Sequence, residues 1–254
     1  MSDVIVEFKD CWKQFPNSEK PVLAGMDLQI KAQTIHILIG FSGAGKSVTL
    51  KHILGLLKPD SGDVLVNDTS IPSLGSMDLR DFRKRYGMLF QSSALFDSLD
   101  VYENVAFPLR EHRKEMSEGQ ISERVEELLA QVDLSDAINK MPSELSGGMQ
   151  KRVGMARCIA LNPEILLFDE PTTGLDPVTS QVIDDLIVQT TRKLKATSII
   201  ISHDIVAALR MADVVSMIGQ GKILETAAPK DLILSQNEMV GKFLTSAGVK
   251  ADKL

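Results

Sequence analysis

A glycine-rich segment with one lysine and one serine, GFSGAGKS, occupies residues 40–47. It fits the pattern G-x-x-x-x-G-K-S, in which glycines let backbone N–H groups converge on phosphate oxygens. An apolar run precedes it and a helical pattern follows it, so the positive end of that helix points at the same anion. We expect Lys46 to reach the β- and γ-phosphates of a nucleotide and the Ser47 hydroxyl to ligate Mg²⁺. The alternative, a glycine turn that arose by chance, is disfavoured by the context on both sides.

Two acidic residues, Asp169 and Glu170, follow a second apolar run, ILLF. The carboxyl ends of core strands are where doubly wound sheets bind their ligands. We therefore predict that Asp169 holds the water shell of Mg²⁺ and that Glu170 polarises a water for in-line attack on the γ-phosphate. The alternative is a capped strand end with two solvated acids.

Two further polar residues follow apolar runs in the same way. His203 comes just after the run SIII, and we expect it to contact the γ-phosphate, although a lone histidine is more often structural. Gln91 comes after YGMLF and is predicted to sense Mg²⁺ or the attacking water, although a glutamine in such a place often has no role.

A second Ser-Gly-Gly turn, LSGGM at residues 145–149, opens a helical pattern that runs to about residue 161. Ser146 as the N-cap, followed by two glycines, predicts a second anion site. A helix cap that binds nothing is the alternative. The spacing places Lys151, Arg152 and Arg157 largely outside the apolar stripe of this helix. That stripe consists of Met149, Val153, Ala156, Ile159 and Ala160.

Short apolar runs alternate with helical patterns along the chain, which predicts an α/β protein with a parallel core sheet. The polar, helical stretch between residues 100 and 142 is interpreted as an insert between two halves of that core. The first long helix is predicted over 46–57. The predicted strands are 4–8, 26–30, 35–39, 63–66, 86–90, 165–168, 198–201 and 214–218.

The composition is that of a soluble globular protein, with 44% hydrophobic and 24% charged residues among 254. A net charge of −6 argues against nonspecific binding to nucleic acid or to an anionic membrane. The apolar runs are far shorter than the roughly 20 residues that span a bilayer, and no signal peptide is visible. Neither Cys11 nor Cys158 has partners at metal-ligand spacing, so we expect no zinc site. We expect a cytoplasmic chain that serves a membrane only through a partner.

The order and spacing of these motifs resemble the nucleotide-binding subunit of ATP-binding-cassette (ABC) transporters over nearly the whole chain. The matching segments are residues 40–47, Gln91, residues 145–150, 165–170 and 173–176, and His203. The resemblance implies a RecA-like P-loop core with an antiparallel β subdomain and an inserted α-helical subdomain. It implies a core of residues 1–91 and 143–240, a helical subdomain of 92–142 that continues into the helix up to about 161, and a C-terminal tail of 241–254.

The resemblance also implies that two copies pair head to tail around two ATP molecules, with Mg²⁺. The turn at Ser146 of one copy then binds the γ-phosphate held by the phosphate loop of the other, and Asp176 is linked to that interface. Phe15 matches the aromatic that stacks on adenine, where a tyrosine is usual, and Trp12 is the alternative. The implied nucleotide-binding residues are Phe15, Gly40, Ser42, Gly43, Gly45, Lys46, Ser47, Val48, Ser146, Gly147, Gly148, Met149 and Asp176.

Within that family, the stretch FQSSALFDSLDVYENVAFPLREH with MPSELSGGM looks like the ATPase of bacterial phospholipid-trafficking (Mla, toluene-tolerance) transporters. That group implies a membrane permease, an MCE-domain lipid-binding protein and a small STAS-domain subunit at the cytoplasmic face of the inner membrane. One alternative is an importer for an amino acid or another small solute. A soluble ABC ATPase that acts on nucleic acid or ribosomes is disfavoured by the single cassette, the lack of heptads and the negative charge.

Overall fold

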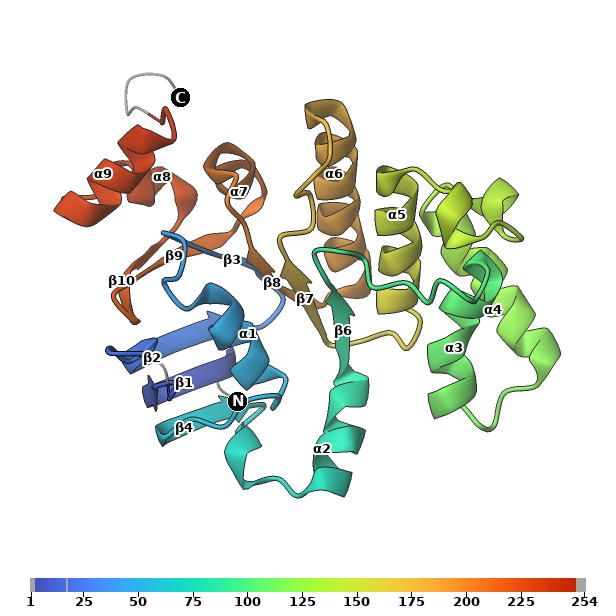
Figure 1. Cartoon of the computed structure of the whole chain (residues 1–254), viewed down its shortest axis with the longest axis horizontal. Coiled ribbons are helices and arrows are strands. Elements are labelled where there is room, and N and C mark those ends of the chain that lie inside the picture. Colours follow the sequence, from blue (N-terminus) through green and yellow to red (C-terminus); the bar gives the residue numbers. More distant parts are fainter. Residues whose placement is uncertain (1–2, 17, 250–254) are drawn as a thin grey trace. The chain divides into compact units, whose positions relative to one another are not determined.

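The computed structural model describes residues 3–16 and 18–249. They form two compact units, coloured along the chain in Figure 1. The first unit holds the described residues up to Arg83 and those from Thr197 onward, and the second holds Lys84–Ala196. Among the described helices, none combines the length and apolar character needed to cross a membrane.

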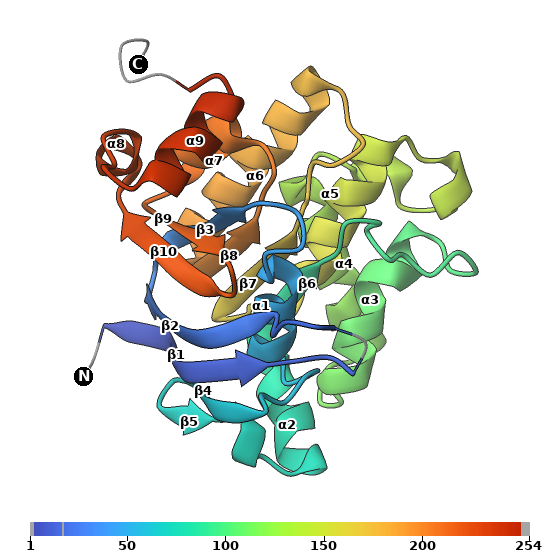
Figure 2. The ribbon, with the colours of Figure 1, turned by 60° about the vertical axis from the view of Figure 1, so that its left-hand side comes forward.

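The first unit begins with an antiparallel sheet, which Figure 2 shows with its strands side by side. Its strand order is β2-β1-β4-β5. The strands are β1 (Val4–Lys13), β2 (Leu23–Lys31), β4 (Ser61–Val66) and β5 (Thr69–Ser70). Val6, Phe8 and Cys11 of β1 are buried. This sheet is the antiparallel β subdomain that the family resemblance implies.

The same unit contains the strands that carry the phosphate loop. They run in the order β10-β9-β3-β8, with β3 parallel to both of its neighbours and β10 antiparallel to β9. Every residue of β3 is buried, as its continuous apolar run predicts. The strands are β3 (Ile35–Gly40), β8 (Thr197–Ile201), β9 (Val214–Gly219) and β10 (Lys222–Ala227). The helices are α1 (Lys46–Ile53), α2 (Ser76–Phe82), α7 (Ile205–Met211), α8 (Pro229–Ile233) and α9 (Glu238–Ser246).

The second unit is built on two parallel strands, β6 (Tyr86–Leu89) and β7 (Ile165–Asp169). Helix α5 (Gly147–Cys158) packs against β6. The approach is close, because a Cβ on Gly87 would lie 2.3 Å from the carbonyl oxygen of Cys158. The other helices are α3 (Val101–His112), α4 (Glu118–Gln131) and α6 (Pro177–Leu194).

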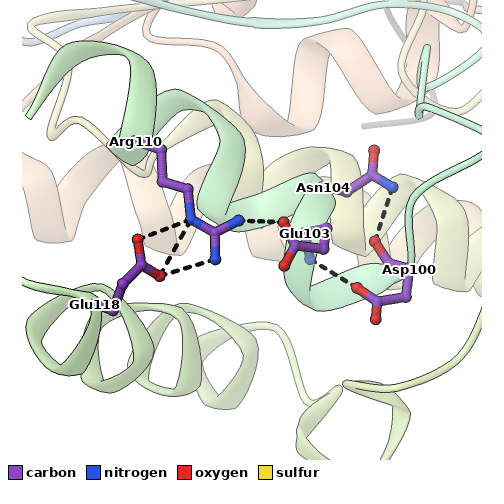
Figure 3. A network of polar contacts seen from close by, with 5 residues as sticks. All are labelled: Asp100, Glu103, Asn104, Arg110 and Glu118. Atoms are coloured by element: carbon purple, nitrogen blue, oxygen red, sulfur yellow. Dashed lines mark hydrogen bonds and ion pairs between the residues drawn. The ribbon is translucent and has the colours of Figure 1, made fainter.

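A polar network joins α3 to the start of α4 (Figure 3). Asp100 caps α3 by accepting the backbone N–H of Glu103 at 2.8 Å, and Asn104 Nδ2 donates to the Asp100 carbonyl oxygen at 2.9 Å. Arg110 then pairs with Glu103 on its own helix and with Glu118 on α4, the latter at 2.9 Å. An ion pair thus connects the two helices of the predicted insert.

The predicted strands are confirmed, with ends that differ by up to five residues. The first long helix ends at Ile53 rather than at residue 57, and α5 ends at Cys158 rather than at 161. The expected insert, 92–142, holds α3 and α4 and lies within the second unit. The expected tail, 241–254, begins inside α9, and residues 250–254 lie outside the described part of the chain.

Candidate functional site

The phosphate loop joins β3 to α1 through backbone conformations that require glycine. Gly45, the residue before α1, has a φ of 106°, which side chains rarely tolerate. A Cβ on Gly40 would lie 2.3 Å from the backbone oxygen of Ile218. The positive end of α1 faces the loop, and Gly45 has no side chain that could cap the first N–H groups of the helix. The loop therefore has the geometry of an anion cradle.

Lys46 is buried, with 6% of its surface exposed. Its Nζ donates to the carbonyl oxygens of Gly40 at 2.8 Å and Phe41 at 3.1 Å. The ammonium is thus held over the loop in which a phosphate would bind. Ser47 and Val48 follow it in the first turn of α1.

A hollow of about 660 Å³ opens beside the phosphate loop. It is lined by Ser18, Lys20, Pro21, Val22, Ala24, Phe41, Ser42, Gly43, Ala44, Gly219, Gln220, Gly221 and Met239. Neither Phe15 nor Trp12 is among these lining residues. The Trp12 indole donates to Asp10 at 2.9 Å, and the Phe15 ring lies 5.9 Å from Lys13 Nζ. Which aromatic stacks on adenine therefore stays a prediction.

His203 lies at the same sheet edge as the phosphate loop. Strands β3 and β8 are parallel, and Leu38 of β3 pairs with Ile201 of β8. Gly40 and His203 each come two residues beyond that pair. His203 is exposed, so its imidazole is accessible at the edge where a nucleotide phosphate would lie.

In the second unit, parallel strand pairing likewise places Gln91 and Glu170 at one sheet edge. Strands β6 and β7 are parallel, and Leu89 pairs with Phe168. Gln91 and Glu170 each lie two residues beyond that pair. The backbone of Glu170 is left-handed, with φ 51°, and its carboxylate accepts the Thr173 hydroxyl at 3.1 Å. Such conformations concentrate at functional sites.

The sequence motifs do not include Lys151, and its predicted position outside the apolar stripe of α5 is wrong. It is buried, with 5% of its surface exposed, and its Nζ donates to the backbone oxygen of Gln91. Burial lowers the pKa of its ammonium, and the negative charge of Glu170 acts in the opposite direction. Lys151 lies four and seven residues before Met155 and Cys158, which are also buried, but the sequence does not show which face of α5 packs against β6.

The second Ser-Gly-Gly turn caps α5 as predicted. The Ser146 hydroxyl accepts the backbone N–H of Met149 at 3.3 Å. Gly148 is needed for packing, because a Cβ there would lie 2.5 Å from Thr179 Cγ2 on α6. Ser146 and Gly147 are exposed, which leaves the start of the helix accessible to another molecule.

Asp176 caps α6. Its Oδ1 accepts the backbone N–H groups of Val178 and Thr179 at 3.0 Å, and its Oδ2 accepts the Thr179 hydroxyl at 2.5 Å. The bond from the Thr179 hydroxyl is the main cause that lowers the pKa of Asp176. Asp176 thereby stabilises the start of α6, and its predicted part in a dimer interface stays a prediction.

The donor types fit Mg²⁺. Ser47 offers a hydroxyl, Gln91 an amide oxygen and Asp169 a carboxylate, and Mg²⁺ prefers such hard oxygen ligands. It usually keeps several waters and is bound through one or two carboxylates together with substrate phosphates. Ser47 lies in the first unit, and Gln91 and Asp169 lie in the second.

Residues 23–173 match the family model described as ABC transporter. The chain is 40% identical over 244 residues to the intermembrane phospholipid transport system ATP-binding protein MlaF of Haemophilus influenzae. The match covers 96% of this chain and 91% of MlaF. It is 39% identical over 230 residues to the methionine import ATP-binding protein MetN of Caulobacter vibrioides. That match covers 91% of this chain and 69% of MetN.

Among solved structures, it resembles a dimeric, post-hydrolysis form of the ATP-binding cassette MJ0796 bound to ADP and Pi. The TM-score is 0.80 at 31% identity, and the match covers 89% of this chain and 99% of that one. The α/β fold with mixed sheets therefore agrees with that of known ATP-binding cassettes.

Proposed function

The chain belongs to the ABC transporter family and is an ATPase, and from this premise we propose that it powers phospholipid transport between the two membranes of a bacterium. The observation that supports the ATPase chemistry best is the complete phosphate loop with Lys46 held over it. The choice of phospholipid rests on the likeness to MlaF over 96% of the chain.

Each predicted residue has a defined role in the proposed mechanism. Backbone N–H groups of the phosphate loop and the ammonium of Lys46 bind the β- and γ-phosphates. The Glu170 carboxylate orients a water and accepts its proton, while His203 donates a hydrogen bond to the γ-phosphate. Mg²⁺, when bound, neutralises charge on the phosphates, and the oxygens of Ser47, Asp169 and Gln91 are its proposed ligands.

We propose that two copies form the active unit. The exposed, serine-capped start of α5 suits a γ-phosphate held by the phosphate loop of a second copy. The dimeric state of the similar cassette supports this arrangement. Hydrolysis would then open the pair, and the helical insert would carry the motion to a membrane partner.

An aromatic pair on the insert supports a protein partner on this side of the cassette. Phe96 and Phe107 are 42% and 43% exposed, and their ring centroids lie 4.9 Å apart. Aromatic side chains are enriched at the centre of protein–protein interfaces, compared with the rest of the protein surface. We assign this surface to an integral membrane permease, which would hold the chain at the cytoplasmic face of the inner membrane. By analogy with the Mla systems, an MCE-domain protein and a STAS-domain subunit complete the proposed assembly.

An importer for methionine or another small solute is the competing function, and the likeness to MetN favours it. The two differ in what stimulates ATP hydrolysis by the assembled complex. Hydrolysis by the complex purified from detergent-solubilised membranes is measured with phospholipid vesicles and with methionine. The proposal predicts stimulation by phospholipid and an MCE-domain protein among the copurified subunits. Stimulation by methionine alone, with a soluble solute-binding protein as the copurified subunit, would refute the lipid assignment.

A further inference from the structure

Lys151 is a buried cation that contacts one residue of the candidate site, Gln91. Its Nζ donates to the backbone oxygen of Gln91, and the negative charge of Glu170 opposes the lowering of its pKa by burial. All three residues belong to the second unit, and Lys151 lies on α5, the helix that begins at the Ser146 turn. One side chain thus links the turn helix to the backbone just beyond β6.

Stability alone gives no reason for a lysine at this position. Removal of an ammonium from water is costly, and even buried ion pairs can often be replaced by apolar residues of similar volume without loss of stability. Lys151 shares its buried face with Met155 and Cys158, so a methionine would suit its surroundings. A cation retained there suggests a role in the reaction.

The loop from Gln91 onward is held at further points, by one contact from α5 and by contacts from α3. Arg157 on α5 donates to the backbone oxygen of Ser93 at 2.8 Å. Ser93 and Ala94 adopt left-handed backbones, with φ 61° and 47°, a conformation that costs energy unless contacts fix it. The Asn104 side chain binds the backbone of Phe96 at 2.8 and 3.1 Å. Lys151 fixes the first residue of this loop.

We infer that Lys151 is a positioning residue for ATP hydrolysis. Its ammonium holds the backbone of Gln91, so that the Gln91 side chain stays at the strand end in a fixed relation to α5. Lys151 acts through Gln91 rather than on the nucleotide. The inference rests on the proposed role of Gln91 in the site.

The first test replaces Lys151 by methionine, which keeps the length and removes the charge. We expect kcat to fall by about 10- to 100-fold, because small misplacements of reacting groups have effects of this size. The Kd for ATP should stay near the wild-type value, since the phosphate loop is unchanged, and Lys151→Arg should recover most of the rate. Arg152→Met is the matched control, because Arg152 donates instead to Val132 and Asp133, and its kcat should stay near wild type.

Thermal unfolding of the Lys151→Met variant distinguishes a positioning role of Lys151 in hydrolysis from a purely structural role in the fold. Because Lys151→Met removes a buried charge, its Tm should equal or exceed that of the wild type, while kcat at 25 °C still falls. An unchanged kcat, or a rate loss that matches the loss of folded protein, overturns the inference.

A double-mutant cycle with Gln91→Ala shows whether Lys151 acts through Gln91. If it does, Lys151→Met lowers kcat in the wild-type background but adds little to the loss that Gln91→Ala already causes. If the fold losses in kcat of the two single variants multiply in the double variant, the positioning inference is overturned, whereas the role of Gln91 stands. A wild-type kcat for Gln91→Ala alone refutes the role of Gln91 in the site, and the inference about Lys151 fails with it.

Discussion

Gln91 and Glu170 lie at equivalent positions beyond two adjacent parallel strands, each two residues past the register pair of Leu89 with Phe168. Parallel pairing fixes this relation, because a shift by one residue would turn every side chain of a strand to the other face. The amide and the carboxylate therefore reach the same sheet edge. Predictions about catalysis follow from this edge and from the phosphate loop.

Replacement of the Glu170 carboxylate should separate nucleotide binding from hydrolysis. Glu170→Gln keeps the size of the side chain and its bond to the Thr173 hydroxyl, but it cannot accept a proton. We expect kcat to fall by about 10²-fold or more, the size typical of the loss of a general base, while ATP binding persists. Steady-state hydrolysis and equilibrium binding are measured on the same preparation. Wild-type turnover would show that another group activates the water.

Lys46→Ala should abolish productive ATP binding, since it removes the only charge that the phosphate-loop motif itself supplies. The change also leaves the carbonyl oxygens of Gly40 and Phe41 without the ammonium that now binds them. Lys51→Ala is a suitable control, because Lys51 is an exposed cation on the same helix. Titration calorimetry with ATP should show no binding for the first variant and normal binding for the second. Equal affinities would contradict the assignment of Lys46.

The features that local sequence determines were predictable. The phosphate loop, the cap at Ser146 and the strand end at Asp169 each depend on neighbouring residues, and the structure has them where the motifs lie. The apolar run of β3 likewise predicted a fully buried strand.

Features that depend on tertiary packing were not predictable. Lys151 is buried because α5 packs against β6, and a polar residue beside an apolar stripe gives no sign of that contact. The strand β10 was also missed, since its half-exposed residues do not form a clear apolar run. The adenine-stacking residue stayed undecided for a similar reason, because no local pattern places Phe15 or Trp12 relative to the hollow beside the phosphate loop.

A methyl group at Gly148 should weaken the turn at Ser146 through a specific clash. The Cβ of Gly148→Ala would lie 2.5 Å from Thr179 Cγ2, so α5 and α6 would have to separate. We expect a loss of about 1–3 kcal/mol in the free energy of unfolding, the usual range for overpacking. Thr179→Ser removes the clashing methyl and keeps a hydroxyl for Asp176. The double variant should regain most of the lost Tm, and a Tm equal to that of Gly148→Ala alone would mean that the clash is not the cause.

Acid should destabilise the fold through His36 in β3. The imidazole is 1% exposed, its Nε2 is hydrogen-bonded to Ser216 Oγ at 2.8 Å, and burial lowers its pKa to about 4. The unfolded chain therefore takes up a proton near pH 6.5, whereas the folded chain does so only near pH 4. The stability that the neutral form provides is complete above pH 6.5 and is lost as the pH falls toward 4, by up to about 3 kcal/mol.

The variant His36→Gln isolates this contribution, because glutamine can keep a hydrogen bond to Ser216 and does not titrate. Chemical unfolding at pH 7.5 and at pH 4.5 gives the loss of stability for each protein. The wild type should lose more than the variant, and the remaining loss should include His52, whose pKa burial also lowers. Equal losses in the two proteins would show that His36 takes up its proton in the folded chain as readily as in the unfolded one.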